Sequence, residues 1–190
     1  MDLPEITKFP VLIISTPRTG SSVLATIIGE KYDLRVFIEP HESQSHLHGF
    51  IEYAQDNKDY LLKIHSRDVD KYPSAILQEL YSDSSFKINT ERRDRASQIA
   101  SAIVAHARNT WAYRVDDYEA PNDEIHFTKA LIDLNINYFK KCYVDTDNLQ
   151  LHFDYVVDYD DLGYIEHRNH VKTPVPSNYQ ELLTAIRSRI

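Results

Sequence analysis

The feature that most constrains the fold is an apolar run followed at once by a turn-forming segment and then by helical periodicity. Residues 9–15 read Phe-Pro-Val-Leu-Ile-Ile-Ser, and a short run of branched apolar side chains is typical of a strand buried on both faces of a parallel sheet. Residues 16–22 are rich in Pro, Gly, Ser and Thr, which favours a tight loop. The apolar residues of the stretch 23–28 then fall on one helical stripe, and Gly29 or the tract just after it is the expected stop. A strand, a loop and a helix in this order favour an α/β fold.

The rest of the chain continues the alternation of strands and helices. Further strands are predicted over residues 34–38, 60–65, 86–89 and 149–157. Helices are predicted over residues 73–81, 94–107, 126–143 and 179–190, and residues 41–49 are predicted to be irregular. We therefore expect a single α/β domain over residues 1–190, with a mostly parallel central sheet flanked by helices.

The composition narrows the class of protein. The chain has 190 residues, of which 42% are hydrophobic and 26% charged, as in ordinary globular domains. Its single cysteine, Cys142, excludes a disulfide framework. No signal peptide is apparent, and no apolar run approaches the roughly 20 residues of a membrane span. These features predict a cytoplasmic protein with no membrane partner.

The charge distribution predicts a local anion site. The net charge of −8 argues against broad nucleic-acid binding. Residues 86–114 nevertheless hold six basic residues against two acidic ones, whereas residues 115–161 hold twelve acidic residues against three basic ones. A basic segment within an acidic chain favours either a site for one anionic ligand or a solvated helix face.

The loop at residues 16–22 has the composition of an anion cradle. A helix N-terminus presents unpaired N–H groups and the positive end of the helix dipole. Gly20 permits a tight backbone, and Arg18 supplies a fork of donors suited to phosphate oxygens. Hydroxyl groups add further donors; they belong to Thr19, Ser21 and Ser22. An ordinary capped strand-to-helix turn is the simpler alternative.

The loop is not a Walker A motif, which requires G-x-x-x-x-G-K-[ST]. Ser15 stands at the position of the first glycine, and Ser21 stands where the lysine belongs. A nucleotide kinase with a degenerate loop, using ATP and Mg²⁺, is one alternative function. A non-catalytic nucleotide-binding module is another.

Two segments resemble sulfotransferases that use 3′-phosphoadenosine 5′-phosphosulfate (PAPS). Ser-Thr-Pro-Arg-Thr-Gly-Ser-Ser at residues 15–22 resembles the family's 5′-phosphosulfate loop. Arg93 after the strand at residues 86–89, followed eight residues later by Ser101, resembles its 3′-phosphate site. The string Arg92-Arg93-Asp94 … Gln98 … Ser101 … Ala105 … Trp111 is similar to the bacterial trehalose sulfotransferase-like branch. Weaker echoes are Lys63-Ile64-His65 and residues 157–162.

The resemblance implies a P-loop-like sulfotransferase fold with PAPS as donor, adenosine 3′,5′-bisphosphate (PAP) as product and no metal. The acceptor would be a hydroxyl of a carbohydrate or small metabolite. The residues that would bind the donor are Arg18, Thr19, Gly20, Ser21, Ser22, Arg93 and Ser101. Arg18 would also stabilise the leaving group, and Arg92 is an alternative to Arg93.

Two residues are candidates for the group that accepts the proton of the acceptor hydroxyl. Glu39 ends a predicted strand where the trehalose-type branch carries a catalytic glutamate. His65 matches the Lys-x-His strand end of cytosolic sulfotransferases, and strand alternation places Lys63 on the same face. The histidines at 41, 46 and 48 fit no zinc-ligand spacing, so we expect an acceptor-site loop there. The segment 170–174 is a candidate for closing over the nucleotide.

Overall fold

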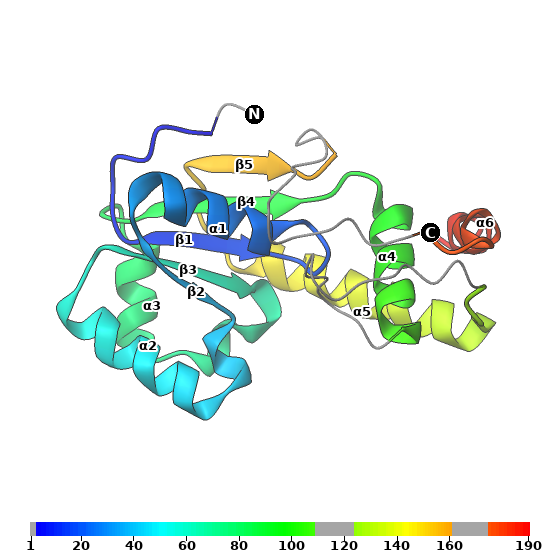
Figure 1. Cartoon of the computed structure of the whole chain (residues 1–190), viewed down its shortest axis with the longest axis horizontal. Helices are drawn as coiled ribbons and strands as arrows, with labels where there is room; N and C mark the ends of the chain where they lie inside the picture. The colour runs from blue at the N-terminus through cyan, green and yellow to red at the C-terminus, as the bar shows by residue number, and fades with distance from the viewer. Residues whose placement is uncertain (1–2, 109–123, 161–174) are drawn as a thin grey trace.

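The computed structural model describes residues 3–108, 124–160 and 175–190. Its centre is a five-stranded sheet in the order β2-β3-β1-β4-β5, and every neighbouring pair of strands is parallel (Figure 1). The strands are β1 (Val11–Ser15), β2 (Arg35–Ile38), β3 (Tyr60–His65), β4 (Phe86–Glu91) and β5 (Tyr155–Asp158). The predicted α/β class with a parallel sheet and flanking helices is therefore confirmed.

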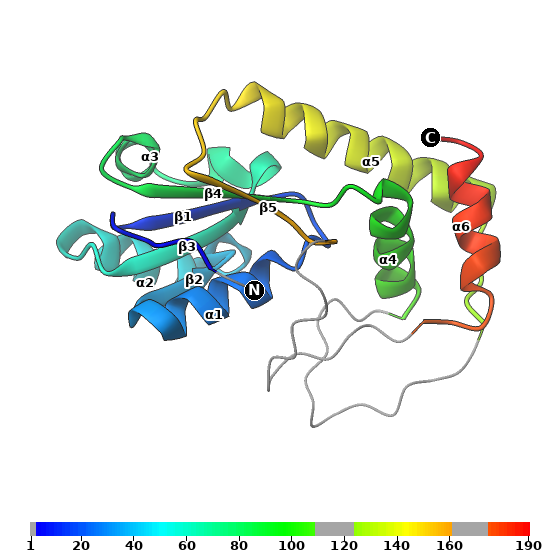
Figure 2. The ribbon, with the colours of Figure 1, turned by 90° about the horizontal axis from the view of Figure 1, so that it is seen from above.

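Helices flank the sheet on both faces. The α-helices are α1 (Ser21–Tyr32), α2 (Gln44–Asp56), α3 (Ser74–Tyr81), α4 (Arg95–Ala107), α5 (Lys129–Asn148) and α6 (Tyr179–Arg187). Two short 3₁₀ helices are η1 (Pro40–Glu42) and η2 (Ser66–Lys71). Figure 2 shows α1 on one side of the sheet and α3 and α5 on the other. None of the helices in the described part of the chain is long and apolar enough to cross a membrane.

The side chains of β1 alternate between two apolar layers. Val11 and Ile13 pack in the layer that α1 covers, whereas Leu12 and Ile14 pack in the layer that α2 and α3 cover. All five residues of β1 are buried, which explains why its first four residues are apolar. The central position of β1, between β3 and β4, fixes the loop that follows it.

A third apolar cluster joins α4, α5 and α6 near the carboxyl-terminal ends of the strands (Figure 1). Ile103, Phe139 and Ile186 are among its fully or almost fully buried members. Asp94 caps α4, because its carboxylate accepts the Ser97 N–H at 3.0 Å. This cluster holds α4 beside the loop that follows β1.

Two predictions about local structure are wrong. The stretch 41–49 is not irregular, because α2 begins at Gln44 and buries Phe50 and Ala54. Polar residues in its first turns interrupt the apolar pattern, so the sequence alone did not indicate a helix there. Helix α1 ends at Tyr32, in the tract just after Gly29 where the stop was expected, and Asp33 terminates it in a left-handed conformation. Of the predicted strand 149–157, only the last part forms β5, since α5 extends to Asn148.

The parallel sheet brings the candidate residues to one edge. Carboxyl ends of parallel strands lie at the same edge, so the segments that follow β2, β3, β1 and β4 are neighbours in that order. Glu39 follows β2, His65 ends β3, and the loop of residues 16–20 follows β1. Arg92 and Arg93 follow β4. Residues far apart in the sequence therefore converge on one site.

Candidate functional site

The loop between β1 and α1 has the backbone of an anion cradle. Arg18 and Gly20 both adopt left-handed conformations, with φ of 64° and 69°. Gly20 is the N-cap of α1, so the first N–H groups of that helix face out of the loop. Left-handed residues within a turn arrange successive N–H groups into a concave, positively polarised nest. The backbone of this loop therefore has the left-handed residues that such a nest requires.

Two of the loop hydroxyls point inward rather than toward a ligand. Thr19 Oγ1 lies 2.8 Å from Thr90 Oγ1 and donates to the Thr16 carbonyl at 3.0 Å. Ser21 Oγ donates to Ser15 Oγ at 3.1 Å. These bonds fasten the loop to β1 and β4. Of the three loop hydroxyls considered, only that of Ser22 remains to join the backbone N–H groups in contacting an anion.

Arg18 connects the loop to α4. Its Nε donates to Ser101 Oγ at 3.1 Å, so two of the residues predicted to bind the donor are in direct contact. Arg93 is placed differently, because its guanidinium pairs with Asp158 at the end of β5. Arg92 pairs with Asp160 at 3.4 Å. Ser101 thus lies with Arg18, and the two consecutive arginines lie with the acidic turn after β5.

Tyr159, from that acidic turn, covers Gly20. A β-carbon built on Gly20 would lie 2.7 Å from Tyr159 Cδ2, and the Arg92 guanidinium lies 4.6 Å from the centre of the Tyr159 ring. The cradle therefore requires glycine at residue 20 for two reasons: the left-handed backbone and the close approach of the ring.

We expect Gly20→Ala to destabilise the fold by about 1–3 kcal/mol, from left-handed strain and overpacking together. Urea unfolding measures the loss. Tyr159→Ala in the same chain should recover only the overpacking part. Full recovery in the double variant would contradict the requirement for a left-handed residue.

A buried ionic cluster occupies the edge beside the loop. The Glu39 carboxylate pairs with the Lys63 ammonium and accepts a hydrogen bond from His65 Nε2 at 3.1 Å. The Lys63 side chain is 1% exposed and that of Glu39 is 15% exposed. Burial opposes ionisation of Glu39, but the hydrogen bond from His65 and the charge of Lys63 outweigh it and hold the Glu39 pKa well below its usual range. Glu39 is therefore ionised at neutral pH.

The second ring nitrogen of His65 faces the loop. Its Nδ1 lies 3.0 Å from Ser15 Oγ, which in turn accepts from Ser21 Oγ. Burial and the nearby Lys63 charge lower the His65 pKa, so the ring is neutral near pH 7. Because an ionised Glu39 can only accept, Nε2–H donates to Glu39 and Nδ1 accepts from Ser15, while the Lys63 ammonium, 3.3 Å from Nε2, pairs with Glu39. A hydrogen-bonded chain thus runs from Ser21 of the cradle through Ser15 and His65 to Glu39.

The neighbouring histidine, His41, belongs to the packing around this cluster. Its Nδ1 lies 2.7 Å from the Tyr72 hydroxyl, and its Nε2 lies 3.6 Å from the Asp68 carboxylate. Burial lowers its pKa. Among the described residues, no group of three or more His, Cys, Asp or Glu side chains is arranged to hold a metal ion.

We expect the protein to lose stability as the pH falls below about 6.5. The pKa of His65 is lowered in the folded state, so between its folded and unfolded values only the unfolded chain binds the proton. Urea unfolding at pH 7.5 and 5.5 measures this loss, which His65→Gln should reduce. The control is His46→Gln at an exposed residue, and an equal reduction in that variant would contradict the role of His65.

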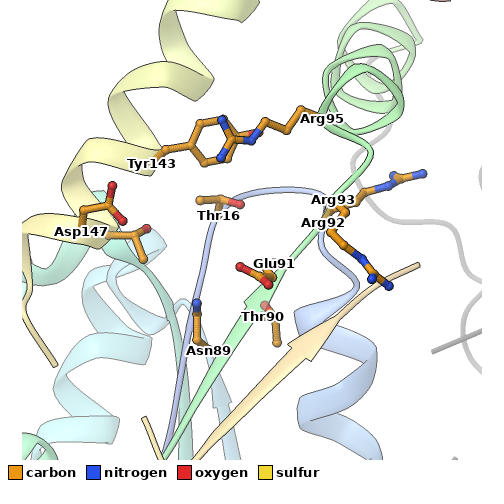
Figure 3. Close-up of a pocket in the computed structure, with 10 residues that line it drawn as sticks. Thr16, Asn89, Thr90, Glu91, Arg92, Arg93, Arg95, Tyr143 and Asp147 are labelled. Carbon is orange, nitrogen blue, oxygen red and sulfur yellow. The ribbon is translucent and has the colours of Figure 1, made fainter. Parts of the chain in front are cut away.

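A cavity of about 280 Å³ opens between β4 and α5. Figure 3 shows Thr16 of the loop, the end of β4, and Arg95 lying against Tyr143. The guanidinium of Arg95 lies 4.4 Å from the centre of the Tyr143 ring. The complete lining is Thr16, Asn89, Thr90, Glu91, Arg92, Arg93, Arg95, Tyr143, Thr146 and Asp147.

Sequence reasoning missed several residues that build the site. Ser15 entered the predictions only through its place in the motif, although its hydroxyl bonds to both the loop and His65. Gln98 appears only in the string that resembles the trehalose sulfotransferase-like branch, with no role predicted for it. No sequence feature predicts a role for Tyr143. The pairing of Arg92 and Arg93 with an acidic turn could be anticipated only in part, from the opposite charges of the two segments. Trp111 and the segment 170–174 lie outside the described residues.

No family model matches this chain, and no curated protein matches it. Two solved structures are similar to it at a low level. One is an uncharacterized protein from Eubacterium ventriosum ATCC 27560, with 12% identity, coverage of 94% of this chain and 98% of that chain, and a TM-score of 0.41. The other is the YorR protein of Bacillus subtilis in complex with phosphorylated GDP, with 13% identity, coverage of 80% and 86%, and a TM-score of 0.40. Neither likeness is close enough to bear on function.

Proposed function

We propose that this chain is a PAPS-dependent sulfotransferase that transfers a sulfuryl group to a hydroxyl of a carbohydrate or small metabolite. The observation that carries the proposal is the hydrogen bond from Arg18 Nε to Ser101 Oγ. It joins the cradle at the N-terminus of α1 to the face of α4 that, by resemblance, binds the 3′-phosphate. One anion site next to another is what a nucleotide with separate 5′ and 3′ phosphates requires.

The residues present fit the donor in composition. The loop N–H groups, Arg18 and Ser22 would hold the 5′-phosphosulfate, and Ser101 with Arg93 would hold the 3′-phosphate. Arg93 and Arg92 already pair with carboxylates from the turn after β5, which supports their suitability for an anionic group. A 3′-phosphate would compete with Asp158 for Arg93.

The chain's own groups would contribute mainly charge stabilisation and positioning. When bound, PAPS supplies the activated sulfuryl group, and its transfer resembles phosphoryl transfer in passing through a loose transition state. Charge then grows on the departing phosphate oxygens. Arg18 and the N–H groups at the start of α1 are the donors placed to stabilise that charge.

Glu39 is the better candidate for contacting the acceptor hydroxyl. Both ring nitrogens of His65 are engaged, one by Glu39 and one by Ser15, so His65 has no free lone pair. Glu39 is ionised, and its pKa is too low for a strong base. Hydrogen bonding to the hydroxyl suffices in a loose transition state, because the hydroxyl proton leaves late. We assign His65 to positioning Glu39.

Calorimetric titration tests the proposal. We expect the protein to bind PAP in the micromolar range and to bind ATP with Mg²⁺ weakly. Binding of ATP with Mg²⁺ in preference to PAP would replace the proposal by the kinase alternative. The protein could also bind PAP but release no PAP from PAPS when a panel of hydroxyl acceptors is present. That result would favour the alternative of a non-catalytic nucleotide-binding module.

The 3′-phosphate site has its own test. Arg93→Ala should weaken PAP binding about tenfold or more through loss of a charge-assisted contact, while leaving the binding of adenosine 5′-monophosphate nearly unchanged. Arg187→Ala, at an exposed arginine on α6, is the control. Equal losses for both nucleotides would remove Arg93 from the 3′-phosphate site.

A further inference from the structure

Gln98 has a fully buried side-chain amide that contacts the loop after β1. It lies on α4 with 0% of its surface exposed. Its Nε2 donates to the Pro17 carbonyl at 2.6 Å and to Thr16 Oγ1 at 2.8 Å. Its Oε1 accepts from the Tyr143 hydroxyl at 2.7 Å. One side chain therefore joins α4, α5 and the loop after β1.

The orientation of this amide is determined by its partners. A carbonyl oxygen can only accept, so the group that faces Pro17 must be the NH₂ of Gln98. Burial raises the pKa of Tyr143 to about 12, so the phenol keeps its proton and donates to the amide oxygen. Rotation of the amide by 180° would place two oxygens against each other at Pro17 and leave the phenol without an acceptor.

We infer that Gln98 is a positioning residue for the anion-binding loop and that Tyr143 fixes Gln98 in its productive orientation. The inference rests on the proposed function, which it deepens by explaining how the loop is held in shape. Neither residue needs to contact the donor.

The consequence for the loop follows from peptide geometry. In a trans peptide the carbonyl oxygen and the next N–H point in opposite directions. Because Gln98 holds the Pro17 carbonyl, the Arg18 N–H points away from Gln98. Gln98 also occupies a lone pair of Thr16 Oγ1, at a residue that lines the cavity, and so restricts the directions in which the Thr16 hydroxyl can donate. One buried amide thus sets the direction of the Arg18 N–H and restricts that of the Thr16 hydroxyl.

Tyr143, which donates to Gln98, also packs against Arg95. The Tyr143 ring carries the Arg95 guanidinium on its face at 4.4 Å (Figure 3). The ring and its hydroxyl therefore do different things, since the ring packs against Arg95 and the hydroxyl orients Gln98. Tyr143→Phe removes the second interaction and keeps the first.

The experiment measures PAP affinity by calorimetry for wild type, Gln98→Met, Tyr143→Phe and the double variant. We expect Gln98→Met to weaken binding about 10- to 100-fold, because buried partners lose their hydrogen bonds, and Tyr143→Phe to weaken it several-fold. In the Gln98→Met background, Tyr143→Phe should cost nothing further, since Tyr143 acts through Gln98. The matched control is Gln180→Met at an exposed glutamine on α6, which should bind PAP as wild type does.

Two results would overturn the inference: wild-type affinity in Gln98→Met, or independent effects that multiply in the double variant. Amide hydrogen exchange at Thr16, Arg18 and Thr19 provides a second measurement that does not depend on the nucleotide. We expect faster exchange there in Gln98→Met, with β1 unchanged. If wild type does not bind PAP, the proposed function fails while the exchange result still decides the role of Gln98: faster exchange supports it, and unchanged exchange refutes it.

Discussion

Glu39→Gln is expected to lower the free energy of unfolding by about 3–5 kcal/mol, the usual cost of leaving one partner of a buried ion pair uncompensated. The Lys63 ammonium is 1% exposed and pairs with Glu39. Glutamine keeps the size of the side chain and can still accept from His65, but it carries no charge. Urea unfolding at pH 7.5 measures the loss, and PAP release from PAPS should fall to background in the same variant.

A second substitution separates the two roles of Glu39. Lys63→Met in the Glu39→Gln chain removes the unpaired charge and should recover most of the stability. Activity should not return, because the carboxylate that we propose to contact the acceptor hydroxyl is still missing. If Glu39→Gln is as stable as wild type, the ion pair does not stabilise the fold as argued. If the double variant regains turnover, the carboxylate is not needed for transfer.

The sequence predicted the neighbours in this cluster better than their roles. Strand alternation correctly places Lys63 and His65 on one face of β3, where Lys63 Nζ lies 3.3 Å from His65 Nε2. The approach of Glu39 follows from pairing Ile38 with Lys63 in a parallel register and from the left-handed turn at Glu39. Register between strands of different segments depends on the whole sheet. The contact between Glu39 and His65, on which the proposed choice of Glu39 rests, therefore could not be predicted from the sequence.

The burial of Gln98 could not be predicted from the apolar periodicity of α4. The apolar stripe of α4 correctly predicts a helix over residues 94–107, and that stripe omits Gln98. Gln98 is nevertheless fully buried, because α5 and the loop after β1 cover a second face of the helix. A pattern on one helix cannot report which other elements pack against it. The same limit hid α2, whose apolar face follows a polar first turn.

Arg18→Ala is expected to lower the rate of PAP release from PAPS by about 10²–10³-fold, the usual effect of removing a donor aimed at developing charge. Arg18 is the one side-chain cation of the cradle sequence 16–22, and the bond from its Nε to Ser101 fixes its direction. Since the departing phosphate carries more negative charge in the transition state than in bound PAPS, the loss should fall mainly on kcat and less on PAPS affinity.

Two variants separate charge from direction at this position. Arg18→Lys keeps the left-handed position and the charge but lacks the planar fork, so we expect partial activity. Ser101→Ala leaves the guanidinium in place without its anchor and should lose a smaller factor, about tenfold for one hydrogen bond. An Arg18→Ala chain that turns over normally at saturating PAPS would mean that the arginine only binds the donor. In that case the loop N–H groups alone would stabilise the leaving phosphate. Because Gln98 holds the loop in shape, Gln98→Met should then lower kcat more than Arg18→Ala does.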